Sequence, residues 1–91
     1  MQTIAEKIKQ RRAQMLVHSY VYYRLGENIV SDHQWQKWAN ELVVLQKEYC
    51  LAIGFYDEAF KDWDGSTGYH LPQDDWVSRK ANRILNIHNE G

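Results

Sequence analysis

The sequence predicts a small all-α domain: an antiparallel helical hairpin, a structured loop, and a C-terminal helix packed across the hairpin. Two long segments carry apolar and aromatic residues at spacings of three and four, the period of a helix face. Each segment opens with a typical N-cap residue, Thr3 or Ser31, and Gly26 between them is a natural helix stop. A chain of 91 residues has room for one core. We therefore expect one domain over 1–91, with the hairpin at about 3–51 and the loop and last helix in 52–91.

The first helix is predicted from Thr3 to Leu25. Thr3 and Glu6 have the spacing of a capping box, and no Gly or Pro interrupts the chain before Gly26. A strand over residues 16–23 is the alternative, because β-branched and aromatic residues with low helix propensity crowd that stretch. The helical register continues through it and no turn signal precedes it, which favours the helix.

The second helix is predicted to start at Ser31 and to end near Tyr49 or Leu51. Gln34 occupies the reciprocal capping position, and Asp32 suits the positive end of the helix dipole. A single apolar stripe should face the first helix: Trp35, Trp38, Leu42, Leu45 and Tyr49. The short connection between the two helices favours antiparallel packing.

The second half of the chain predicts less regular structure. Residues 57–60 suggest one or two helical turns, and the Gly- and Pro-containing stretch 61–75 reads as a loop. Loops of this length are usually functional or disordered, but three apolar side chains argue that this one folds back: Trp63, Tyr69 and Leu71. Asp74 or Asp75 should cap a last helix that reaches about His88, with these buried positions: Val77, Ala81, Ile84, Leu85 and His88.

Composition narrows the classes of function. The formal net charge is −1, but basic residues gather in the first helix and acidic residues follow it. Either the basic and acidic faces neutralise each other within the domain, or this uneven charge distribution helps to bind a partner. One cysteine, Cys50, excludes an internal disulfide, so we expect a cytoplasmic protein. No apolar run is long enough to span a membrane, and four histidines without ligand spacing predict no metal site.

The segment HSYVYYRLGENIVSDHQWQKWANELVVLQKEY, about residues 18–49, resembles the N-terminal helical module of bacterial NAD-dependent DNA ligases. The resemblance rests on a Tyr/His-rich helix end (His18, Tyr20, Tyr22), the loop-end run Ile29-Val30-Ser31-Asp32, the aromatic Trp35, and the run Glu41-Leu42-Val43-Val44-Leu45. It implies the helical hairpin and a module that closes over the nicotinamide mononucleotide half of NAD without supplying the nucleophilic lysine.

The same resemblance implies five candidate ligand-binding residues. Tyr22 matches a family aromatic residue that would stack on the pyridinium ring. Asp32 matches a family acid that would accept a hydrogen bond from the carboxamide or from a ribose hydroxyl. Three positions depart from the family: Tyr23 replaces a histidine, Trp35 a tyrosine, and Gln36 an aspartate. NAD or nicotinamide mononucleotide is therefore the candidate ligand, and no cofactor is firmly implied.

No catalytic role is expected. The ligase nucleophile lies in a Lys-x-Asp-Gly motif, whereas Lys61-Asp62-Trp63-Asp64-Gly65 has one residue too many. Asp64-Gly65 and the following Ser66-Thr67-Gly68 are ordinary turn formers.

Three hypotheses of function follow. The first is a non-enzymatic protein-interaction module, possible cargo of a phage or mobile element, that engages a host factor through a loop surface of Trp63, Asp64, Tyr69 and His70. The alternative is a nicotinamide-nucleotide binding module. The third is weak nucleic-acid binding through a basic first helix with Lys7, Lys9, Arg11 and Arg12.

Overall fold

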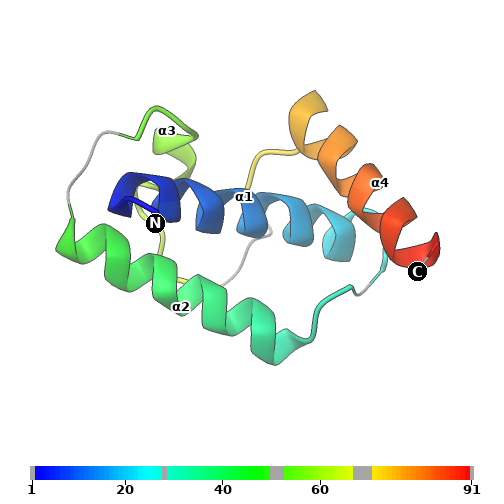
Figure 1. Ribbon diagram of the computed structural model, residues 1–91, viewed down its shortest axis with the longest axis horizontal. Coiled ribbons are helices and arrows are strands. Elements are labelled where there is room, and N and C mark those ends of the chain that lie inside the picture. The colour runs from blue at the N-terminus through cyan, green and yellow to red at the C-terminus, as the bar shows by residue number, and fades with distance from the viewer. Residues whose placement is uncertain (1, 28, 50–52, 67–70, 91) are drawn as a thin grey trace.

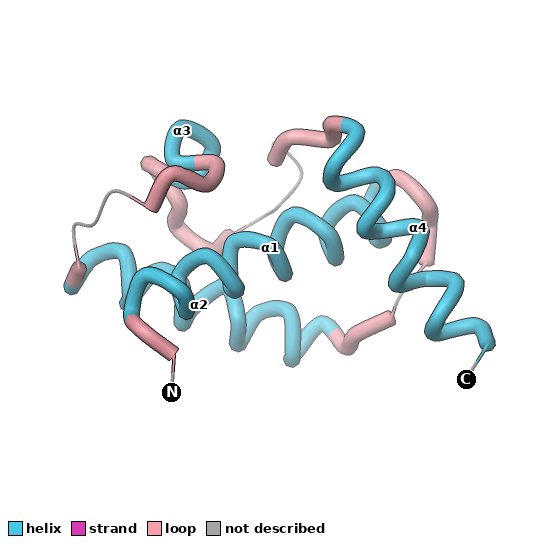
Figure 2. The backbone as a smooth tube through the Cα atoms, turned by 45° about the horizontal axis from the view of Figure 1, so that its top comes forward, coloured by secondary structure: helices cyan, strands magenta, loops and turns pink. Residues whose placement is uncertain are grey.

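The computed structural model describes residues 2–27, 29–49, 53–66 and 71–90. Within these ranges the chain is all-helical, with α1 (Ile4–Tyr23), α2 (Asp32–Glu48), α3 (Asp57–Phe60) and α4 (Asp75–Glu90). Helix α1 lies in the middle, antiparallel to α2, and α4 crosses its C-terminal half (Figure 1). A second view shows α1 and α2 side by side, with α3 near one end and α4 at the other (Figure 2). The predicted all-α class is confirmed.

Helix α1 begins and ends as its sequence signals indicate, within two residues. Thr3 caps it, because its hydroxyl oxygen accepts from the Glu6 N–H at 3.1 Å. At the other end Gly26 takes a left-handed conformation with φ of 67°, and the Glu27 N–H donates to the Val21 carbonyl at 3.1 Å. The helix thus ends at Tyr23 and the chain turns toward α2.

Helix α2 is capped as predicted, because the Ser31 hydroxyl accepts from the Gln34 N–H at 3.1 Å. Ala39 and Leu42 are its fully buried residues. The prediction that Tyr49 continues the buried stripe is wrong. Tyr49 is the C-cap with extended backbone, outside the helix, and its residue is 40% exposed.

The core is built on opposite sides of α1. On one side lies a cluster that joins α1, α2, α3, the later loop and the start of α4: Ile8, Met15, Leu16, Ala39, Leu42, Phe60, Trp63, Leu71 and Val77. On the other side Val17 and Val21 pack against Ala81 of α4. Because α1 is covered on both sides, its apolar residues are spread around the helix, including the crowded stretch 16–23 that also allowed a strand.

The loop after α3 folds back onto the hairpin, as its apolar residues predicted. Trp63 is 7% exposed and its indole N–H donates to the Ala39 carbonyl at 3.1 Å, while Leu71 is 4% exposed. Tyr69 lies outside the described residues. The burial of Trp63 corrects its assignment to an exposed interaction surface: its ring is part of the core.

Helix α4 is capped by Asp74, whose carboxylate accepts from the Val77 N–H at 3.0 Å. Val77 and Ala81 are fully buried, as predicted. Ile84 and Leu85 are only half-buried, and the prediction that His88 is buried is wrong. The last turns of α4 extend past the end of α1 (Figure 1), and His88 in these turns is exposed.

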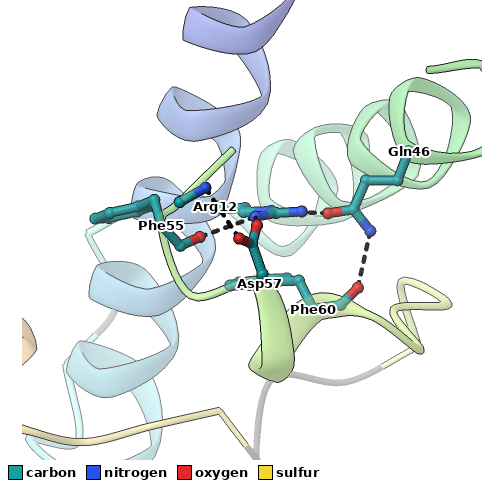
Figure 3. A network of polar contacts seen from close by, with 6 residues as sticks. Arg12, Gln46, Phe55, Asp57 and Phe60 are labelled. Atoms are coloured by element: carbon teal, nitrogen blue, oxygen red, sulfur yellow. Dashed lines mark hydrogen bonds and ion pairs between the residues drawn. The ribbon is translucent and has the colours of Figure 1, made fainter. Parts of the chain in front are cut away.

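A buried arginine fastens α3 to the hairpin (Figure 3). The Arg12 guanidinium donates to Gln46 Oε1 at 2.8 Å, to the Phe55 carbonyl at 2.8 Å, and to Asp57 Oδ1 at 2.6 Å. Gln46 in turn donates to the Phe60 carbonyl at 2.9 Å. The network therefore joins α1, α2 and the segment around α3.

Candidate ligand cleft at the α1–α2 join

A cleft of about 220 Å³ opens where α1 ends, the chain turns, and α2 begins. Its described lining residues come from all three segments: His18, Ser19, Tyr22, Tyr23, Glu27, Ile29, Val30, Asp32, Trp35 and Gln36. The five residues predicted to bind a ligand are all among them. They gather there because positions 18, 19, 22 and 23 share one face of α1, and the antiparallel turn brings the first turn of α2 opposite that face.

Aromatic rings form two parts of the cleft wall. Tyr22 is 52% exposed and meets Tyr23 edge to face, with ring centroids 4.9 Å apart. Trp35 is half-buried, and its indole N–H donates to the Ser19 hydroxyl at 3.3 Å. Trp63 packs behind Trp35 at 6.3 Å between centroids. The core thus holds Trp35 in place, while Tyr22 offers an open face.

Two carboxylates, Glu27 and Asp32, line the same cleft, and both residues are exposed. Asp32 lies in the first turn of α2, where the helix dipole stabilises its charge. Among the described lining residues there is no lysine or arginine. The cleft therefore carries negative charge at neutral pH, which complements a cationic ligand.

Gln36 has a structural task at the edge of the cleft. Its amide nitrogen donates to the Gly65 carbonyl at 2.9 Å and to Asn40 Oδ1 at 3.0 Å. The bond to Gly65 ties the loop that carries Trp63 to α2, whereas Asn40 lies on α2 itself. For a ligand, Gln36 offers its carbonyl oxygen, because its amide hydrogens are already engaged.

His18 also lines the cleft. From the sequence, helix packing was favoured for it over a role in which it polarises Asp32 across the join. Its ring lies against Trp38, with centroids 5.4 Å apart, and its Nδ1 is buried without a hydrogen-bond partner among the described residues. Burial lowers the pKa of the His18 imidazole below 6.5, so the ring is neutral at pH 7. Its position four residues before Tyr22 is the signal that would have placed it in the cleft.

The predicted interaction surface on the loop after α3 is only partly described by the structure. Asp64 is exposed, but its carboxylate accepts from the Ser66 N–H at 2.9 Å and from the Ser66 hydroxyl at 2.7 Å, so it shapes a turn. Tyr69 and His70 of the predicted interaction surface lie outside the described residues, as does Cys50.

No group of three or more potential metal ligands occurs within the described ranges. None of the helices described there is long and apolar enough to cross a membrane.

The basic first helix is largely neutralised within the domain. Arg11 pairs with Glu41 of α2 at 3.0 Å, and Arg12 pairs with Asp57 at the start of α3. Lys7 and Lys9 remain toward the N-terminus, and Lys9 lies over the Phe55 ring. This arrangement favours one of the two interpretations, in which the basic and acidic faces neutralise each other within the domain. It argues against a free basic surface for nucleic acid.

Comparison with known proteins supports a relationship to DNA ligases over part of the chain. A 46-residue stretch, half of this chain, is 39% identical to a protein named DNA ligase from Petrotoga mobilis. The match covers 7% of that ligase's length. No family model matches the sequence, and no solved structure matches it. The chain is thus a small helical domain with a ligase-like segment.

Proposed function

We propose that the cleft binds the nicotinamide half of a nicotinamide nucleotide, with nicotinamide mononucleotide and NAD as candidate ligands. The observation that carries the proposal is the grouping of Tyr22, Asp32 and Trp35 around one open cleft. The ligase-like segment supports it, because the DNA-ligase module that the sequence resembles handles this ligand.

The chemistry of the cleft suits a nicotinamide ring. The oxidised ring is a planar cation, and the open face of Tyr22 offers a π surface for such a group. The Asp32 carboxylate can accept a hydrogen bond from the carboxamide or from a ribose hydroxyl, and its charge attracts the pyridinium. A cavity of about 220 Å³ lies below the range of about 300–1,000 Å³ typical of sites that enclose drug-sized ligands. It therefore suits a ring and part of a sugar, with the remaining nucleotide outside.

Titration calorimetry with nicotinamide mononucleotide and NAD tests the proposal. We expect heat of binding for both ligands at up to millimolar concentration. Asp32→Asn should weaken binding about tenfold, because one charge-assisted hydrogen bond is worth about 1.5 kcal/mol. Glu48→Gln is the matched control, since this exposed acid lies at the opposite end of α2. Absence of heat with either ligand, or equal affinities for the Asp32 and Glu48 variants, would refute the proposal.

A second candidate function is protein interaction without catalysis, as a module that engages a host factor. The exposed pair Tyr22 and Tyr23 favours it, because tyrosines are enriched at the energetic centres of interfaces. Retention of a specific lysate protein by the wild type but not by Tyr22→Ala/Tyr23→Ala, undisturbed by nicotinamide mononucleotide, would support this candidate. Retention of the same protein by both the wild type and the double variant would exclude this surface.

A further inference from the structure

We propose that the cleft recognises the nicotinamide riboside portion of its ligand and gains nothing from the 5′-phosphate, so that it binds nicotinamide riboside at least as tightly as nicotinamide mononucleotide. This inference rests on the proposed function and specifies its ligand. The juxtaposition that carries it is a stacking wall beside two carboxylates, with no basic side chain in the described lining.

The fixed charges of the cleft oppose a phosphate. Glu27 and Asp32 both line it, and a phosphate monoester carries about −1.5 to −2 charges at pH 7. His18 adds no compensating cation at neutral pH, because burial lowers the pKa of its imidazole. The riboside lacks the phosphate and keeps the positive ring, so its single positive charge is attracted to both carboxylates of the cleft and nothing in it is repelled by them.

The start of α2, the obvious anion site, is already partly occupied by the chain's own groups. Helix N-termini bind phosphates through free N–H groups and the helix dipole. Here the Gln34 N–H donates to the Ser31 hydroxyl and the Trp35 N–H donates to the Ser31 carbonyl. The Asp32 carboxylate occupies the same turn and interacts with the dipole. A ligand phosphate would have to compete with this side chain for the same helix end.

The side-chain amide at the edge of the cleft is engaged, and the described lining includes no lysine or arginine. The Gln36 amide nitrogen donates to Gly65 and Asn40. Arg24 follows α1 directly and is exposed, but it is not among the residues that line the cleft. Among the arginines it is the one nearest in the sequence to the cleft residues Tyr22 and Tyr23, and it is therefore the residue to vary as a control.

Parallel titrations of the wild type with nicotinamide riboside and nicotinamide mononucleotide test the inference. We expect the mononucleotide to bind at least about threefold more weakly than the riboside at an ionic strength of about 0.01 M, where the Debye length is about 30 Å. The two affinities should approach each other near 0.15 M, where the Debye length falls to about 8 Å. Mononucleotide binding that is threefold tighter than riboside binding would overturn the inference and leave the proposed function standing. Absence of binding by both ligands would overturn both.

Two variants make the test sharper. Glu27→Arg places a cation in the cleft lining and should reverse the preference, so that the mononucleotide binds about tenfold better than the riboside. The Glu27 backbone N–H that closes α1 is retained in this variant. Arg24→Ala should leave the wild-type ratio unchanged. A ratio that shifts further toward the riboside in Arg24→Ala would show that Arg24 binds the phosphate, and would overturn the inference.

Discussion

At the residue scale, Arg12 shows how one buried cation fixes an irregular segment. Its side chain is 7% exposed and donates to a side chain of α2, a main-chain carbonyl and the Asp57 carboxylate. The hydrogen bond from Arg12 is the main cause that lowers the pKa of Asp57, helped by the Gly54 N–H. Arg12 also lies over the Phe60 ring, so the guanidinium packs against the core as well as pairing with charge.

Removal of this guanidinium should be costly. Arg12→Met keeps the aliphatic stem but leaves the Phe55 and Gln46 oxygens without their donor, so we expect the free energy of unfolding to fall by about 2–3 kcal/mol. Urea denaturation followed by circular dichroism measures this. Arg83→Met, on an exposed position of α4, is the control and should stay within about 0.5 kcal/mol. Equal effects for the two variants would contradict the role given to the network.

His18 should make stability depend on pH. Its pKa is below 6.5 in the folded state because burial disfavours the imidazolium, whereas in the unfolded chain it is about 6.5. Below pH 6.5 the unfolded state therefore binds more protons, and the free energy of unfolding falls as pH decreases. His18→Gln removes this contribution, so its stability between pH 6.5 and 5.5 should change less than that of the wild type. Parallel curves for the two proteins over this range would contradict a buried, neutral His18.

At the element scale, glycines with positive φ set the turns on which the fold depends. Gly54 and Gly65 have φ of 74° and 77°, but only Gly65 is packed against another element. A Cβ at Gly65 would lie 3.2 Å from Val43 Cγ2 and 3.4 Å from the Ala39 carbonyl oxygen. The Gly65 carbonyl also accepts from Gln36, so this glycine lets the loop approach α2 closely beside the cleft.

These two glycines form a matched pair for mutation. Both Gly54→Ala and Gly65→Ala incur the strain of positive φ, about 1 kcal/mol. We expect Gly65→Ala to cost at least about 1 kcal/mol more in thermal or urea unfolding, because the added methyl group also crowds α2. Equal losses in the two variants would mean that the loop does not press against α2 as described.

The sequence predicted the elements that have strong local signals. Thr3, Gly26 and Ser31 marked helix ends correctly, because capping depends on near neighbours in the chain. The grouping of the five predicted ligand residues followed from the resemblance and from the turn between the two helices. The sequence could not give the exposure of His88, since this depends on where α4 crosses α1. It did predict that the loop with Trp63 folds back, but not that the Trp63 indole would donate to Ala39 of α2. For His18 the sequence favoured helix packing over a role beside Asp32, because its spacing from Tyr22 fits both.

At the scale of the whole molecule, α1 is the shared wall between two clusters. Ala81 of α4 is fully buried against Val17 and Val21 on one side of α1, whereas Val77 belongs to the cluster that α1 shares with α2 and α3. Ile87, near the end of α4, is 59% exposed. Without α4, Val17 and Val21 of α1 would lose their cover. The ligase-like hairpin is thus completed by a helix from the second half of the chain, and the domain should unfold as one unit.

Substitutions in α4 test this dependence. Val77→Ala should lower the free energy of unfolding by about 2 kcal/mol, whereas Ile87→Ala should change it by less than about 0.5 kcal/mol. Urea transitions monitored by tryptophan fluorescence and by circular dichroism should coincide in both variants. Separate transitions, with the hairpin surviving after α4 unfolds, would contradict a single cooperative core.

The central claim is that the cleft at the α1–α2 join binds a nicotinamide-type ring beside Trp35, and the indole N–H signals of the protein in ¹H–¹⁵N NMR test it most directly. Trp35 lines the cleft, whereas Trp63 is buried and donates to the Ala39 carbonyl. Titration with nicotinamide riboside should shift the Trp35 signal, assigned by its loss in Trp35→Phe, and leave the Trp63 signal in place. A Trp35 signal that does not move at millimolar riboside would contradict the claim.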